Sequence, residues 1–211
     1  MNTTIVAVTS VRNRRGDLLR AYAAEIASRL GLMTVESLDD AEAAKKLQVE
    51  GRLAFRVADL ALPGVPTIVP QEEPLLCRAG ILRDVFVPIG GDEAGPYAVE
   101  RTLPFASALD ARVTVFHSTW RKPHLASDVP LEHCRAQTKR NLAWAEERVA
   151  ASGVPHAVLA GIHSDIVEGI ILTALQARCC LIAVARSLHI GRGSHVDRIV
   201  TQSPIPVLVW R

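Results

Sequence analysis

The sequence predicts an α/β fold in which helices cover both faces of a doubly wound, parallel, five-stranded sheet. Aromatic residues make up only 4% of the chain although 49% of it is hydrophobic, so the core is built mainly from Val, Ile, Leu and Ala. These residues are typical of parallel strands that are buried on both faces. From residue 84 onward, strand-like and helix-like segments alternate, as they do when crossover helices join parallel strands.

The expected strands are short apolar segments, and most are bounded by glycine, proline or polar turn residues. We expect strands at residues 85–89, 113–117, 157–160, 181–184 and 207–210.

Helical spacing of apolar residues fills the intervals between these strands. We expect helices at residues 96–109, 131–151 and 166–177, and one short helix before the last strand. Asp165, followed by Glu168, has the pattern of an N-cap with a carboxylate in the first turn of the helix. Pro204 and Pro206 end the short helix, because proline cannot continue it.

The first part of the chain has the same pattern in a shortened form. We expect a strand at residues 4–9, a helix at 17–30, a strand at 33–37 and a helical stretch after Gly51-Arg52, with the two middle strands missing. Residues 51–52 and 63–70 repeat the pattern of residues 191–192 and 203–210 at one constant offset. This self-similarity indicates an internal repeat.

Composition and spacing exclude several classes of protein. A net charge of +2 is too small for a nucleic-acid binder. The four cysteines form no C-x-x-C pair, which favours a reducing cytoplasm, and no H-x-x-H or H-E-x-x-H spacing supports a metal site. The longest apolar stretch, residues 170–185, is interrupted by Gln176 and Arg178, so we expect no membrane insertion. The start of the chain has the wrong order for a secretory signal.

Four segments in this order resemble a universal stress protein domain: residues 84–92 (DVFVPIGGD), 113–117 (VTVFH), 161–163 (GIH) and 193–211. The resemblance implies an adenine-nucleotide alpha-hydrolase-like fold at residues 84–211. Residues 72–83 would then be a linker, and residues 1–71 a degenerate second copy of the domain, as in tandem members of the family.

The resemblance also implies a ligand site, from which this chain departs in two places. The family's nucleotide-binding members place an Asp after the first strand, where this chain has Gly90. Their phosphate loop reads G-x-x-G, then nine residues, then G-[S/T]. In this chain Ala185 and Leu188 replace the two early glycines, and only four residues separate Leu188 from Gly193-Ser194. The candidate ligand-binding residues are Pro88, Gly90, Gly91, His117, Gly161, His163, Ala185, Arg186, Gly191, Arg192, Gly193 and Ser194.

We therefore expect a non-enzymatic regulatory or interaction module with a degraded nucleotide site and no resident cofactor. The alternative is a ligand-sensing domain that binds ATP, AMP or another small anion through the shortened loop, as the soluble part or accessory of a transporter. A hydrolase is disfavoured, because the sequence places no nucleophile beside a base. The uncovered last strand predicts either an internal pseudo-dimer, in which residues 67–69 pair with 207–209, or a homodimer. A different protein as the partner is a further alternative.

Overall fold

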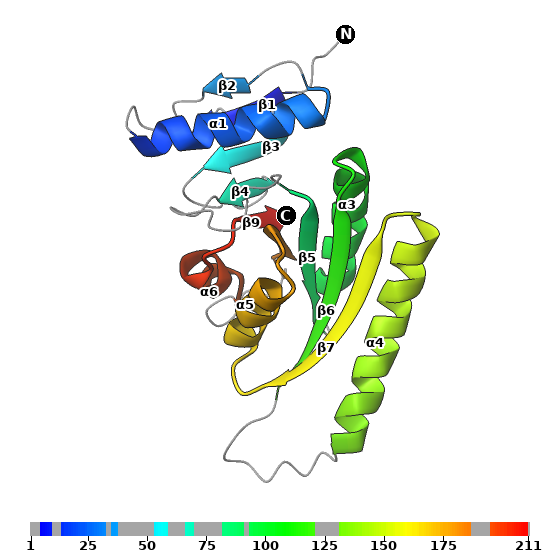
Figure 1. Cartoon of the computed structure of the whole chain (residues 1–211). Coiled ribbons are helices and arrows are strands. Elements are labelled where there is room, and N and C mark those ends of the chain that lie inside the picture. Colours follow the sequence, from blue (N-terminus) through cyan, green and yellow to red (C-terminus); the bar gives the residue numbers. More distant parts are fainter. Residues whose placement is uncertain are drawn as a thin grey trace.

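A computed structural model describes residues 5–9, 14–32, 35–37, 53–58, 66–69, 82–90, 93–120, 131–186 and 195–210. Within them, nine strands form one sheet in the order β2-β1-β3-β4-β9-β8-β5-β6-β7. Helices lie on both faces of this sheet (Figure 1). The predicted α/β class is confirmed.

The second part of the chain alternates strands and helices as predicted, with ends that differ by only a few residues. Its elements are β5 (Asp84–Ile89), α3 (Ala94–Ala108), β6 (Arg112–Trp120), α4 (Leu131–Ala151), β7 (His156–His163), α5 (Ile166–Gln176), β8 (Leu181–Ala185), α6 (His195–Gln202) and β9 (Val207–Trp210). Its five strands pair in parallel in the order β9-β8-β5-β6-β7, as the doubly wound topology requires.

The first part of the chain contributes β1 (Ile5–Thr9), α1 (Arg14–Arg29), β2 (Val35–Ser37), β3 (Leu53–Ala58) and β4 (Thr67–Val69). The predicted helical stretch after Gly51-Arg52 is wrong, because residues 53–58 form β3, which pairs in parallel with both β1 and β4. The expectation that two middle strands are missing is therefore also wrong, since β3 is a fourth strand of the first part. Arg56 and Val57 point to opposite faces of this strand and both are buried, so the segment lacks the polar alternation that marks a half-exposed strand. The predicted linker at 72–83 lies outside the described residues except for Leu82 and Arg83.

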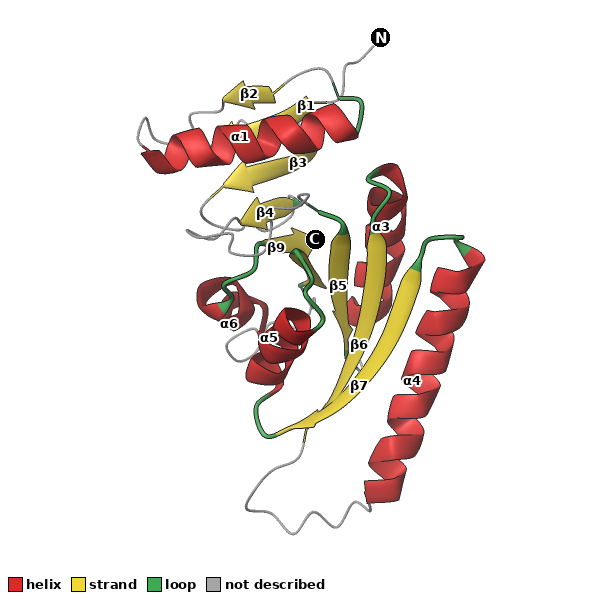
Figure 2. Ribbon diagram, in the orientation of Figure 1, coloured by secondary structure: helices red, strands yellow, loops and turns green. Residues whose placement is uncertain are grey.

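The two parts of the sheet meet at one antiparallel junction between β4 and β9 (Figure 2). Thr67 lies opposite Val209, Ile68 opposite Leu208 and Val69 opposite Val207. The other strand pairs among the described residues are parallel. The edge of β9 that the sequence leaves open is therefore covered by a strand of the same chain.

Two hydrophobic clusters fill the two faces of the sheet. Val85 and Val87 of β5 belong to the cluster beneath α3 and α4, which also contains residues of α1. Phe86, between them in sequence, belongs to the opposite cluster beneath α5 and α6. All three side chains are fully buried. A strand covered on both faces reads as an unbroken apolar run, which is why β5 was recognisable in the sequence.

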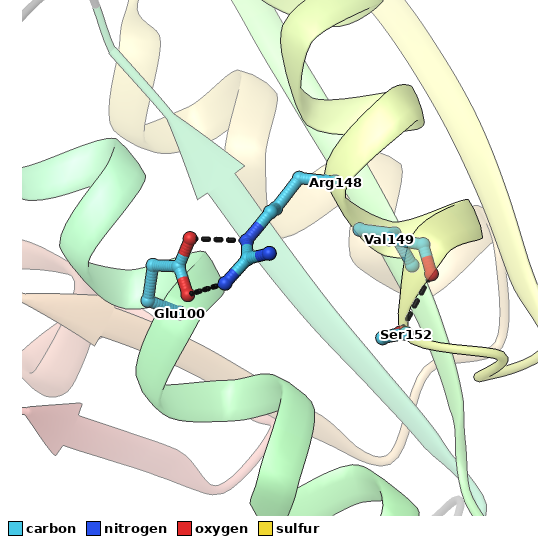
Figure 3. Close-up of polar contacts among 4 residues, drawn as sticks. All are labelled: Glu100, Arg148, Val149 and Ser152. Carbon is cyan, nitrogen blue, oxygen red and sulfur yellow. Dashed lines mark hydrogen bonds and ion pairs between the residues drawn. The ribbon is translucent and has the colours of Figure 1, made fainter.

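Helices α3 and α4 are linked at the surface by an ion pair. Arg148 of α4 donates to both carboxylate oxygens of Glu100 in α3, and the Nη2–Oε2 distance is 2.7 Å (Figure 3). This arginine lowers the pKa of Glu100. Both side chains are about half exposed, so solvent screens the pair. The position of α4 therefore depends mainly on its buried residues, such as Ala145 and Val149.

The last strand is fixed to α3 by a buried polar contact. The indole Nε1 of Trp210 donates to Thr102 Oγ1 at 2.9 Å, and the Trp210 ring lies edge-on to Phe105 with 5.9 Å between centroids. Thr102 is fully buried, so this contact satisfies a polar group that would otherwise be unpaired in the core.

Candidate functional site

The candidate site lies at the carboxyl ends of the parallel strands β5, β6, β7 and β8. Strand β5 lies between β6 and β8. The chain leaves β5 through α3 on one face and β8 through α6 on the opposite face. The ends of β5 and β8 therefore flank the topological switch point, where ligands of doubly wound sheets bind.

Strand β5 ends without a functional side chain at this point. Pro88 is half-buried, and Gly90 is exposed immediately after the strand. The first turn of α3 lies close against this end, since a Cβ on Gly95 would lie 3.0 Å from the backbone nitrogen of Gly90. The position for which the family resemblance implies an Asp therefore presents only backbone.

Arg186 follows β8 and its guanidinium is held by α6. The preceding residue, Ala185, is buried, and the backbone N–H of Arg186 donates to the carbonyl oxygen of Trp210 at 3.4 Å. Its Nη2 donates to Asp197 Oδ1 in the first turn of α6 at 2.7 Å. Its Nε is shut off from solvent and has no hydrogen-bond partner among the described residues. The guanidinium is thus only partly satisfied.

Asp165 joins the starts of α5 and α6. Its Oδ1 accepts hydrogen bonds from the backbone N–H groups of Val167 at 2.8 Å and Glu168 at 3.2 Å, so the predicted N-cap is confirmed. Its Oδ2 accepts from Arg198 Nη2 of α6 at 2.7 Å. The hydrogen bond from Arg198, followed by those from the backbone amides, lowers the pKa of Asp165.

His163, at the end of β7, is packed against two glycines and a serine. Its Nδ1 lies 3.2 Å from Ser118 Oγ on β6, and its ring lies edge-on to Phe116 at 5.9 Å. A Cβ on Gly169 of α5 would lie 2.5 Å from His163 Nδ1, and one on Gly161 would lie 3.1 Å from the same atom. The absence of side chains at these two positions makes room for the imidazole.

The Ser118–His163 contact corrects the expectation that no nucleophile lies beside a base. Sequence reasoning missed it because the two residues are far apart in the chain and come together only through the β6–β7 register, which pairs Ser118 with Gly161. The carboxylate nearest in sequence, Asp165, does not complete a triad, since α5 and Arg198 already use its oxygens. The described contact therefore orients the His163 ring.

His117 lies on the other face of the sheet from Phe116. Its Nε2 is 3.0 Å from Asn141 Nδ2 of α4, and its Nδ1 has no partner among the described residues. The side chain is buried, and desolvation lowers its pKa. The structure thus separates His117 from His163, although the sequence grouped them in one candidate site.

Several predicted site residues lie outside the described part of the chain, namely Gly91, Gly191, Arg192, Gly193 and Ser194. Over the described ranges, no group of three or more His, Cys, Asp or Glu side chains is arranged to hold a metal ion. Among the helices that the structure describes, none is both long and apolar enough to cross a membrane.

Comparison with known proteins places this arrangement in a family. A universal stress protein from Archaeoglobus fulgidus DSM 4304 has a similar structure, with a TM-score of 0.67 at 12% identity over 100% of this chain and 99% of that chain. A universal stress protein in complex with cAMP has a TM-score of 0.53 at 19% identity, over 63% of this chain and 99% of that one. A third similar structure, the universal stress protein from Archaeoglobus fulgidus in complex with dAMP, has a TM-score of 0.50 at 14% identity, over 63% and 100% of the two chains.

At these identities the structural likeness concerns the fold. No curated protein matches the sequence. A sequence model of the Universal stress protein family matches residues 82–211, which is more than half of the chain and includes every strand end described above. The chain therefore belongs to the universal stress protein family.

Proposed function

We propose that this chain is a cytoplasmic, non-enzymatic regulatory or interaction module. Its nucleotide site is degraded and does not bind ATP in the manner of the family. The observation that carries this proposal is the end of β5, where Gly90 offers no carboxylate to an adenosine. A hydrogen bond to a charged group contributes about 1.5–3 kcal/mol, so its loss weakens binding by about one to two powers of ten. Ala185 and Leu188 in place of loop glycines act in the same direction.

Calorimetric titration with ATP and AMP tests this function. The expected result is binding weaker than micromolar for both nucleotides. The variant Gly90→Asp is expected to strengthen AMP binding at least severalfold, whereas Gly90→Asn, which has nearly the same size but no charge, strengthens it less. Micromolar binding of ATP by the unmodified chain would contradict the proposal.

A second candidate function is a ligand-sensing domain for an adenine nucleotide or another small anion, as the soluble part or accessory of a transporter. Arg186 favours it, because a cation lies at the switch point and its Nε lacks a partner among the described residues. The similar structures with cAMP and dAMP agree with this ligand class. If Arg186→Glu combined with Arg192→Glu leaves anion affinity unchanged in calorimetry, this candidate is eliminated.

We also propose that residues 1–71 are a shortened copy of the domain at 84–211 and that the two copies form an internal pseudo-dimer. The sequence repeat relates residue 68 to residue 208, and the sheet places Ile68 directly opposite Leu208. In a two-fold interface the residue on the axis faces its own counterpart and the flanking residues pair reciprocally, as Thr67 does with Val209 and Val69 with Val207. Outward from the junction, β4-β3-β1-β2 occupy the positions of β9-β8-β5-β6, and among the described strands β7 has no counterpart. The constant offset of the sequence repeat does not extend to β3, since it would align this strand with the start of α6.

Sedimentation separates this arrangement from a homodimer. The full chain is expected to be monomeric, because β4 covers β9, whereas a chain lacking residues 1–71 exposes β9 and dimerises. A full chain that is dimeric, and becomes monomeric after this deletion, would contradict the pseudo-dimer. A stable complex with a different protein would support the interaction role.

A further inference from the structure

In the Arg186–Asp197 pair, the guanidinium of Arg186 uses only some of its N–H donors. A guanidinium presents parallel N–H groups that match the two oxygens of one carboxylate or phosphate. Here one nitrogen, Nη2, reaches Asp197 Oδ1 at 2.7 Å, while Nε is buried without a partner among the described residues. An oxyanion that reached both nitrogens would satisfy more of the guanidinium than the single contact to Asp197 does.

The two partners differ in how firmly they are held. Arg186 directly follows β8, and its backbone N–H donates a hydrogen bond to the carbonyl oxygen of Trp210. Its side chain is 28% exposed. The Asp197 side chain is 58% exposed and lies on the surface of α6. An exposed aspartate changes rotamer at little cost, so Asp197 is the partner that gives way when another anion approaches Arg186.

Helix α6 keeps its position when Asp197 turns away. Val196 and Ile199 anchor it in the hydrophobic cluster beneath the sheet. Arg198 holds it to Asp165 at the start of α5 through a separate ion pair. The Arg186–Asp197 pair is therefore not the main attachment of the helix, and its opening does not require α6 to unfold.

We infer that Asp197 is a built-in competitor for Arg186, which occupies the guanidinium until a phosphate-bearing ligand displaces it. This inference rests on the ligand-sensing function proposed above and specifies its regulation. Arg186 is the group that binds the phosphate, and Asp197 sets the ligand concentration at which binding occurs. Because an exposed ion pair is weak, Asp197 raises this threshold by about twofold to fivefold.

Calorimetric titration with AMP, and with adenosine as the uncharged probe, tests the inference. Asp197→Asn removes the competing charge and keeps the size of the side chain. It is expected to tighten AMP binding about twofold to fivefold without changing adenosine binding. Glu168→Gln is the matched control, since it removes one exposed carboxylate from the first turn of α5 and leaves Arg186 untouched. Its AMP affinity should equal that of the unmodified chain.

A third variant shows whether Asp197 acts through Arg186. In Arg186→Gln, AMP binds more weakly, and adding Asp197→Asn no longer tightens it. Thermal unfolding of each variant establishes that it is folded before titration.

The outcomes separate the inference from the function on which it rests. If the unmodified chain binds AMP and Asp197→Asn binds it no more tightly, the inference is overturned and ligand sensing stands. If only Asp197→Asn binds AMP, the inference is supported. If neither binds AMP, the inference is overturned and AMP is excluded as the ligand that the domain senses. If Glu168→Gln tightens AMP binding as much as Asp197→Asn does, the effect comes from net charge and the inference is overturned.

Discussion

Replacing Gly169 with alanine tests whether α5 and the ring of His163 are packed as closely as the structure describes. A Cβ at residue 169 would lie 2.5 Å from His163 Nδ1 and 2.8 Å from His163 Cβ, and closer still to Cγ. These separations are shorter than contacts between real side chains. The imidazole must therefore move, and it then loses its hydrogen bond to Ser118.

The expected magnitude combines opposing effects. Overpacking of this kind costs about 1–3 kcal/mol. The lost hydrogen bond contributes about 0.5–1.5 kcal/mol, and alanine in place of glycine inside a helix returns about 0.5–1 kcal/mol. We expect Gly169→Ala to lower the free energy of unfolding by about 1–3 kcal/mol. In a His163→Ala background the obstruction is gone, so the same substitution should stabilise the protein by about 0.5–1 kcal/mol.

Urea unfolding followed by circular dichroism, on the two single variants and the double variant, measures this coupling. Gly153→Ala is the control, because Gly153 has a φ of +74° and nothing lies within 4 Å of its added Cβ. That variant should be destabilised to the same extent with or without His163. If the effects of Gly169→Ala and His163→Ala are additive, the close packing of the ring against α5 is refuted.

Three further predictions concern buried groups elsewhere in the fold. Thr102→Val leaves the buried Trp210 N–H without its acceptor and should cost about 1–3 kcal/mol in urea unfolding, whereas Thr102→Ser should cost less than Thr102→Val; equal losses would contradict this role. Burial lowers the pKa of His117, so the free energy of unfolding should decrease as pH falls below about 6.5, where the unfolded state takes up the proton more readily than the folded state. His117→Gln should flatten this pH dependence; an unchanged slope would contradict the prediction. Burial raises the pKa of Cys179 to about 12, so iodoacetamide at pH 8 should label this thiol only after denaturation, as peptide mass spectrometry can measure; labelling of the folded protein would contradict it.

The sequence predicts the second part of the fold well because its strands are buried on both faces. Residues such as Phe86 and Val87 form unbroken apolar runs between clear turns. Strand β3 could not be recognised in the same way, since Arg56 interrupts its apolar run although it is buried in the fold. Local propensity is a weak guide for such a segment, because its neighbours β1 and β4 decide its conformation.

The candidate site is less predictable than the fold because its contacts join residues that are distant in sequence. The cap at Asp165 was predictable, since it acts within three residues. The pairing of Arg186 with Asp197 and of Ser118 with His163 depends on the places of α6 and of the strand ends, which no local pattern encodes. The faces to which His117 and His163 belong likewise follow from register and from packing against neighbouring helices.

The antiparallel junction between β4 and β9 determines when the sheet can be completed during synthesis. Strand β9 follows every other described element, so β4 emerges from the ribosome well before its partner exists. Until then the edge of β4 is open to other strands, and chaperones that shield exposed strand edges have time to act. Joining the two halves is therefore a late event, and a translational pause before residue 207 would prolong the interval in which the nascent chain is prone to aggregate.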